Sequence, residues 1–292
     1  MIAMLNTPRF AMALCLLSFV APLAIAQESA EQRDAGEIAT WMAIYQKEAA
    51  SYELSVGSKR NEPLKLEPNM LLKYSNPVRT GDQHGGVFLW TQAGRPAAVA
   101  SIWSSIPNNA TERSLAIEFL SLTTSPIRSK HAPRQGKRGP VPDWEVKAAG
   151  IARKPIADAP LPAKTEALRL VQMRRLAEEF QASISSSPLE TAQPLRLQTK
   201  PLFRYSSADS GVTDGALFAY VLGTDPELFL LIEALRGDAD ERWLFAAARF
   251  TNRPLSLRRG EAEVWSCDVA KTYDGSQPYF IYWGVATEKD LK

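Results

Sequence analysis

The sequence predicts an α+β fold of two tandem repeats, each an N-terminal amphipathic helix packed on an antiparallel β-meander of about five strands. Three observations support this prediction: one stretch of the chain occurs twice, a helical period precedes each copy, and short apolar runs bounded by turn residues follow each helix. The expected boundaries are residues 30–147 for the first repeat, 148–164 for a Pro/Ala-rich linker and 165–292 for the second repeat.

The duplicated stretch comprises Pro63–Ser75 (PLKLEPNMLLKYS) and Pro194–Ser206 (PLRLQTKPLFRYS), which share Pro, Leu, Tyr and Ser at matching positions. The match continues where Gly85–Trp90 faces Gly215–Tyr220. Apolar alternation alone does not require identities at polar and turn positions, so these identities indicate a duplication.

Each repeat is expected to begin with a helix, because apolar residues recur at three- and four-residue steps while charged residues occupy the other side. In the first repeat these positions are Ile38, Trp41, Ile44 or Tyr45, Ala49 and Tyr52. In the second they are Leu168, Val171 or Gln172, Leu176 and Phe180.

The remainder of each repeat consists of short β-type runs separated by Gly, Pro, Asn and Asp, and turn dipeptides such as Asp214-Gly215 favour hairpins over crossovers. The sheet is therefore predicted to be antiparallel. The run Leu228–Leu235 also has the composition of a buried helix, but Pro226 and Gly237 bracket a length typical of a strand, so we predict a strand. The expected strands are 64–67, 70–75, 87–91, 97–104, 115–123, 195–198, 202–206, 216–222, 228–234, 243–251, 263–268 and 279–285.

Residues 1–26 have the pattern of a secretory signal peptide. Arg9 precedes the apolar run Phe10–Ile25, and Ala24-Ile25-Ala26 forms an A-x-A cleavage site before Gln27. No later stretch is apolar enough to anchor the mature chain in a membrane. We therefore expect an exported protein that is periplasmic or extracellular.

Cleavage after Ala26 removes Cys15 and leaves Cys267 as the single cysteine, so no disulfide within the chain is expected. It also removes Arg9 from the 34 basic side chains, which leaves 33 against 32 acidic ones. This balance argues against a nucleic-acid partner.

Catalytic and metal-binding signatures are missing from the sequence. The two histidines, His84 and His131, lack metal-ligand spacing, and no serine-hydrolase, zinc-protease or P-loop motif occurs. His84 aligns with Asp214 of the second repeat, so we expect it in a turn. No metal and no cofactor are predicted.

The absence of catalytic motifs does not exclude a catalytic pair of carboxylates that the fold brings together, because glycosidases need only two acids held several ångströms apart. A hydrolase or glycan-processing enzyme is therefore the first alternative function. The candidate acids are Asp143, Glu145, Asp214, Glu233 and Asp268.

A basic loop distinguishes the first repeat. Pro126 to Trp144 spans 18 steps and Pro254 to Trp265 spans 11, so the first repeat has about seven extra residues there. Such a loop either binds an anionic polymer through its cations or is simply a solvated loop. The candidate anion-binding residues are Arg128, Lys130, Arg134, Lys137 and Arg138, joined by Arg258 and Arg259 of the matching loop.

The runs Tyr74-Ser-Asn-Pro77, Gly86–Thr91 and Asp214–Tyr220 resemble an uncharacterised family of exported bacterial proteins with a tandem-duplicated unit. The resemblance implies export and a two-part layout, and it implies no activity. We expect a non-catalytic binding or scaffolding protein of the cell envelope, whose partner is an anionic envelope polymer or a protein. The second alternative is a carrier that encloses an apolar ligand between helix and sheet.

Overall fold

The computed structural model describes residues 21–57, 62–76, 82–106, 110–186, 191–237, 241–270 and 274–291, with side chains from residue 36 onward. The chain divides into two compact units, Met1–Trp41 and Met42–Lys292. Helix α1 (Ala21–Ala50) begins in the first unit and ends in the second. None of the helices among these residues is long and apolar enough to cross a membrane. The fold described below is that of the second unit.

The predicted α+β class is wrong, because the protein is mostly β, with 50% of residues in strands and 14% in helices. The described residues contain three helices: α1, α2 (Glu166–Glu178) and the short α3 (Glu288–Leu291). Each predicted helix is followed at once by a strand that the sequence analysis missed, β1 (Glu53–Val56) after α1 and β13 (Phe180–Ile184) after α2. The predicted helix-plus-meander repeat therefore does not exist as such.

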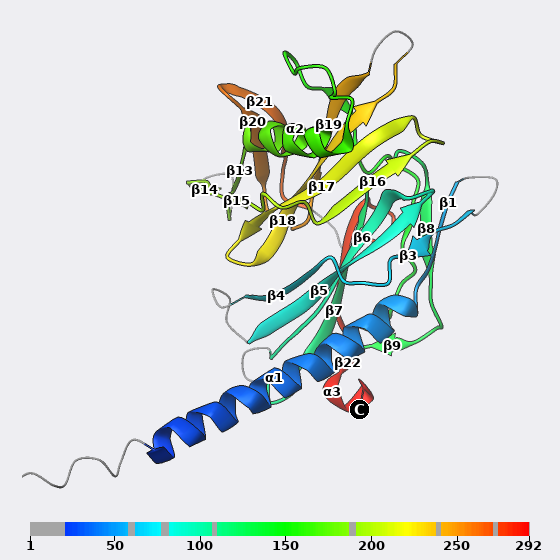
Figure 1. Ribbon diagram of the computed structural model, residues 1–292. Coiled ribbons are helices and arrows are strands. Elements are labelled where there is room, and N and C mark those ends of the chain that lie inside the picture. Colours follow the sequence, from blue (N-terminus) through cyan, green and yellow to red (C-terminus); the bar gives the residue numbers. More distant parts are fainter. Residues whose placement is uncertain are drawn as a thin grey trace, which may run out of the picture. The chain divides into compact units, whose positions relative to one another are not determined.

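Two six-stranded antiparallel sheets form the centre of the unit (Figure 1). In the first, the order is β22 (Tyr279–Thr287), β7 (Ser114–Ser121), β6 (Arg95–Ser105), β5 (Gln83–Gln92) and β3 (Lys65–Leu66), and β4 (Leu72–Asn76) also pairs with β5. In the second, it is β12 (Lys154–Pro155), β19 (Arg242–Arg249), β18 (Asp225–Leu235), β17 (Val212–Leu222) and β15 (Arg196–Leu197), and β16 (Phe203–Ser207) also pairs with β17. All twelve predicted strands are present, and the ambiguous run Leu228–Leu235 lies in β18.

The two six-stranded sheets pack face to face. Val87, Leu89 and Val99 of the first sheet share one buried core with Leu217 and Phe229 of the second. The contacts at the two ends are reciprocal, since Gly94 lies against the Ser206 carbonyl and Thr224 donates a hydrogen bond to the Ser75 carbonyl. Ser75 and Ser206 are the final residues of the duplicated stretch.

The outer faces of the central sheets are covered by two four-stranded sheets. One has the order β11 (Glu145–Val146), β8 (Ile127–Lys130), β1 and β2 (Glu62–Pro63), and the other β14 (Gln193–Pro194), β13, β20 (Leu255–Arg259) and β21 (Ala262–Cys267). Helix α2 joins the second cover, burying Met173, Leu176 and Ala177. Strand β18 is therefore buried on both faces, which explains its continuous apolar run Leu228–Ile232.

The helix α2 buries only part of the predicted stripe, because Leu176 is buried within it and Phe180 just after it. Leu168 and Val171 are exposed, whereas Arg169 is buried because its Nε donates to Asp214 Oδ2 at 2.9 Å. A buried ion pair thus sets the orientation of this helix, which apolar periodicity cannot anticipate.

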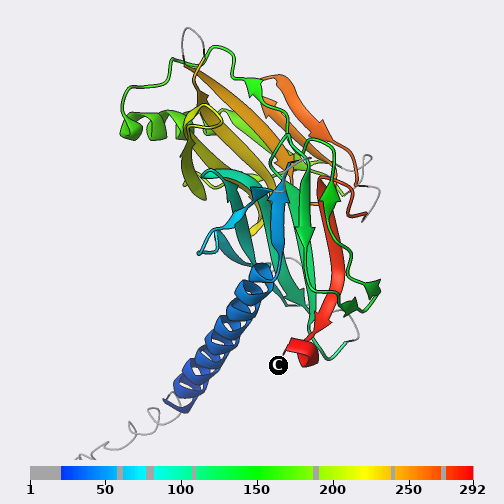
Figure 2. The same ribbon diagram turned by 90° about the vertical axis from the view of Figure 1, so that its right-hand side faces the viewer.

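Each central sheet ends on a strand from outside the segment that supplies its other strands. Strand β22, from the C-terminal part, pairs with β7 (Figure 2), and β12, which follows the first half, pairs with β19. The predicted linker 148–164 contains β12 and buries Ile151 and Ile156, so it belongs to the core.

Candidate functional site

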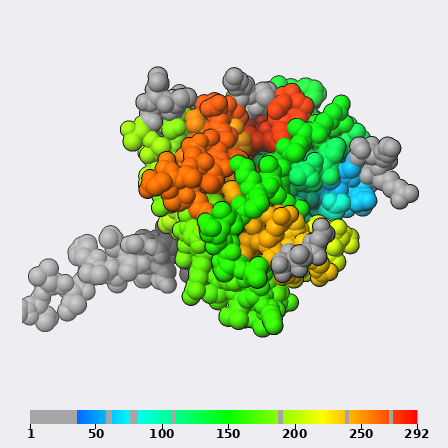
Figure 3. All heavy atoms as spheres, turned by 90° about the horizontal axis from the view of Figure 1, so that it is seen from above, coloured from blue at the N-terminus to red at the C-terminus, as the bar shows by residue number. Residues whose placement is uncertain are grey.

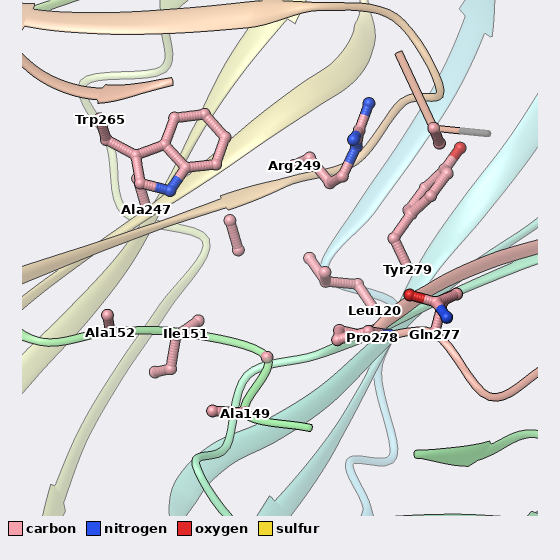
Figure 4. A pocket seen from close by; sticks show the side chains of 13 residues that line it. Leu120, Ala149, Ile151, Ala152, Ala247, Arg249, Trp265, Gln277, Pro278 and Tyr279 are labelled. Atoms are coloured by element: carbon pink, nitrogen blue, oxygen red, sulfur yellow. The ribbon is translucent and has the colours of Figure 1, made fainter. Parts of the chain in front are cut away.

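A cavity of about 400 Å³ lies where segment 149–152, β19, β21 and the start of β22 come together. Seen from above, the green, orange and red parts of the chain meet on one face (Figure 3). The walls are mainly apolar, formed by Leu120, Ile151, Ala247, Ala248, Trp265 and Pro278. We call this cavity the apolar pocket (Figure 4).

The pocket exists because the edge of β19 is only partly covered. Strand β12 pairs with Leu244 and Phe245 and no further, so Ala246–Arg249 have no strand neighbour on that side among the described residues. Alanine side chains leave space that the bulkier residues of neighbouring strands would fill. A short edge strand beside a run of small residues therefore produces the cavity.

Segment 149–152 closes the pocket on one side, and its path depends on Gly150. The Gly150 amide donates to the Thr123 carbonyl at 2.8 Å, and a Cβ atom at this position would lie 2.1 Å from the Ser121 carbonyl oxygen. Only glycine fits so close to the backbone of β7. Ala149 and Ala152, on either side of the buried Ile151, are exposed at the rim.

Arg249 provides the positive charge of the pocket and lies between Trp265 and Tyr279 (Figure 4). Its Nε donates to the Thr251 carbonyl and its Nη2 to the Arg253 carbonyl, both at 2.9 Å. Its guanidinium carbon lies 5.4 Å from the centre of the Tyr279 ring, within cation–π range. Arg249 forms no ion pair with a carboxylate in the part of the chain that the structure describes.

The phenol of Tyr279 stays protonated at physiological pH. Burial, together with the negative charge of Glu118, raises its pKa well above the ordinary value, and its hydroxyl donates to Glu118 Oε1. Cys267 lies at the end of β21 as a free thiol, and burial raises its pKa too. Neither group is therefore an activated nucleophile or base.

The predicted anion-binding residues do not line the apolar pocket, and four of the seven have acidic partners. Arg128 pairs with Glu145, Arg134 with Glu48, Arg258 with Glu261 and Arg259 with Glu179. The set is divided between two sheets, with Arg128 and Lys130 on β8 and Arg258 and Arg259 on β20. Lys130, Lys137 and Arg138 are exposed.

The extra residues of the basic loop form a small hairpin, β9 (Gln135–Gly136) and β10 (Gly139–Pro140), which lies against the outer edge of β22. The Lys137 amide donates to the Gly284 carbonyl at 2.8 Å, and Tyr282 Oη donates to the Gly139 carbonyl at 2.9 Å. Covering an edge strand prevents unwanted strand pairing. The insertion therefore has a structural role, whatever its cations bind.

The candidate carboxylates do not form a catalytic pair. Asp214 and Glu233 lie on opposite faces of the second central sheet, paired with Arg169 and Arg204 and with Arg95 and Arg153, respectively. This separation follows from the two-residue period of strands.

Asp143 and Glu145 do line a common concavity, an open one of about 600 Å³ that Asp274 also lines. However, hydrogen bonding to Arg128 lowers the pKa of Glu145, and hydrogen bonding to Ser276 lowers that of Asp274. A general acid requires a raised pKa. Asp268 lies after β21 and lines neither this concavity nor the apolar pocket.

The expectation of a turn at His84 is wrong. His84 lies in β5, is buried, and its Nδ1 is 2.8 Å from Tyr45 Oη. Burial lowers its pKa to about 4. His131 Nε2 is 3.8 Å from Asp143 Oδ1, and no group of three metal-ligating side chains occurs in the described ranges.

Comparison with family models, curated proteins and solved structures found no match to this chain. The resemblance to exported bacterial proteins therefore stays a prediction. None of the site residues predicted from the sequence lines the apolar pocket, although the unusual run Ala246-Ala247-Ala248 within a predicted strand was a signal that space is left there.

Proposed function

We propose that this chain is a non-catalytic binding protein of the cell envelope, and that its apolar pocket holds a small apolar ligand with an anionic end. The observation that carries the proposal is Arg249, a cation without a carboxylate partner among the described residues, at the side of an apolar cavity of about 400 Å³. Small-molecule sites are typically clefts of about 300–1,000 Å³ with apolar walls and few polar groups.

The lining of the pocket supports binding rather than catalysis. Arg249 and Tyr279 are its titratable groups, and burial keeps Tyr279 protonated. No aspartate, glutamate, histidine, serine or cysteine of the described residues lines it. General bases and nucleophiles come most often from these residue types, and Tyr279, which could also serve as a base, stays protonated.

The second alternative function, a carrier of an apolar ligand, agrees with this proposal in the class of ligand. It differs in the place of the ligand, which was expected between helix and sheet. The interface between α2 and the second central sheet is filled by Met173, Leu176 and Ala177 packed against residues such as Phe218. The space for an apolar ligand lies instead between the edge of β19 and segment 149–152.

Two fluorescent probes with the same apolar body test this proposal. Anilinonaphthalene sulfonate carries an anion, whereas N-phenylnaphthylamine does not, so the ratio of their dissociation constants reports the contribution of a cation. We expect Arg249→Gln to weaken binding of the sulfonate probe about tenfold, since a charge-assisted hydrogen bond contributes about 1.5 kcal/mol. Binding of the neutral probe should hardly change, and Arg249→Lys should restore most of the difference.

Filling the pocket provides a second readout. Ala152→Phe places a ring at the rim and should weaken binding of both probes, whereas Ala148→Phe, at an exposed position outside the pocket, should not. Equal binding of both probes by native protein and Ala152→Phe would refute the proposal. Native mass spectrometry of protein taken from the envelope should show an added ligand mass and a chain that begins at Gln27.

A further inference from the structure

A second cavity, of about 370 Å³, lies at the other end of segment 149–153 and differs from the apolar pocket in chemistry. Its lining is polar and includes Arg95, Arg153, Thr123 and Ser207, contributed by both halves of the chain. Glu62 and Asp209 also line it. We call it the polar pocket.

A buried ion cluster lies beside the polar pocket. Glu233, on β18, is 1% exposed. Its Oε1 accepts from Arg95 Nε and from Tyr205 Oη, both at 2.7 Å, and its Oε2 lies 2.9 Å from Arg153 Nε. Arg95 reaches this carboxylate across the interface between the two central sheets.

The charges of this cluster do not balance. Two guanidinium groups share the single carboxylate of Glu233, and neither forms a further ion pair with a described residue. Burial lowers the pKa of Arg153 even though Glu233 lies beside it. Within the described chain, Arg95 Nη2 and Ser207 Oγ are buried and lack a hydrogen-bond partner, which is rare for buried polar atoms.

The equivalent place in the other half shows that packing does not require this arrangement. Asp225 at the start of β18 corresponds to Arg95 at the start of β6. Trp103, which pairs with Gly85, corresponds to Glu233, which pairs with Gly215. There, Trp103 and Trp283 line a cavity of only about 30 Å³. An open, polar cavity lined by Arg95 and Arg153 is therefore a specific feature of one half.

We infer that the polar pocket binds a small oxyanion, either a phosphate-like or a carboxylate group, with Arg153 as its main contact. The side chain of Arg153 lines the pocket and is 25% exposed, and the forked donors of a guanidinium match such oxygens. The carboxylates of Glu62 and Asp209 oppose a polyanion, so the ligand is a single compact anion. This inference is independent of the function proposed for the apolar pocket.

Isothermal titration with phosphate, sulfate and acetate, at an ionic strength held constant with chloride, tests the inference. Native protein should bind at least one of these anions, and comparison of phosphate with acetate distinguishes the two ligand classes. Arg153→Gln should reduce that affinity at least tenfold, and Arg153→Lys should retain part of it. Because Arg153→Gln leaves Glu233 paired with Arg95, we expect the variant to fold, which its circular dichroism spectrum checks.

The matched control is Lys154→Gln, because Lys154 is the exposed neighbour whose Nζ donates to the Val264 carbonyl. It should bind the anion as native protein does, as should Ala152→Phe, which alters only the apolar pocket. Absence of binding beyond that of chloride, or equal binding by native protein and Arg153→Gln, would overturn the inference.

Discussion

Replacing Glu233 by glutamine removes the one carboxylate of the buried cluster while keeping the size of the side chain. Arg95 and Arg153 would then remain beside each other without a counter-charge, in a site where the side chain of Glu233 is 2% exposed. The amide oxygen can still accept from Arg95 and Tyr205, but the amide nitrogen would face the Arg153 donor, so the change removes a charge and an acceptor together.

The expected cost is large for a single substitution. Removing one partner of a buried ion pair destabilises proteins by about 3–5 kcal/mol, which is a substantial part of a typical total of about 5–15 kcal/mol. Urea unfolding followed by tryptophan fluorescence measures the free energy of unfolding of Glu233→Gln and of native protein. A second change, Arg153→Gln, removes one of the two unpaired cations, so the double variant should regain about 1–2 kcal/mol.

The control is Glu145→Gln, because Glu145 forms an ion pair with Arg128 in which both side chains are exposed. Exposed pairs contribute little, so its unfolding midpoint should match that of native protein. If Glu233→Gln proved as stable as Glu145→Gln, the assignment of Glu233 as the counter-charge of a buried cluster would be wrong.

Two further predictions concern pH and backbone packing. The pKa of His84 in the folded protein, about 4, lies below the ordinary value of 6.5, so the unfolded chain takes up the proton first as pH falls. The free energy of unfolding should therefore fall by about 1–2 kcal/mol between pH 7 and pH 5, and by less in His84→Gln. Urea unfolding at both pH values measures this difference, and an equal fall in native protein and His84→Gln would exclude His84 as the cause. Gly150→Ala should lower the free energy of unfolding by about 1–3 kcal/mol, because its Cβ would meet the Ser121 carbonyl, whereas Ala149→Ser at the exposed neighbour should have no effect on the unfolding midpoint.

The long strands of the central sheets were predictable because each is an apolar run between turn residues, whereas the two-residue strand β12 lies in the predicted linker. Of the four-stranded covers only β21 was predicted, since most of the other strands there have two to five residues and little apolar content, as in β2 and β14. Phe180 continues the helical stripe of α2 in sequence but begins β13 in the structure. The α+β prediction failed at these points, where periods of two and 3.6 residues overlap.

The candidate sites depend on contacts that no local pattern records. Arg95 and Glu233 are adjacent only because two sheets stack, and the walls of the apolar pocket come from six separate stretches of the chain. The basic residues of the loop 128–138 were recognisable, but their acidic partners, such as Glu48 for Arg134, were not. Predicting the charge of a loop is therefore easier than predicting whether that charge is available.

The edge strands β12 and β22 are far in sequence from the other strands of their sheets. The order of synthesis therefore determines how long the edge of each sheet stays unpaired. Strand β12 is made before β19, so the second central sheet has its final strand in place when β19 emerges from the ribosome. Strand β7, in contrast, waits for β22, a delay of about 8–30 s at ordinary elongation rates. During this interval the edge of β7 is open to pairing with other chains, so the first half of the protein is where a nascent chain most needs protection from aggregation.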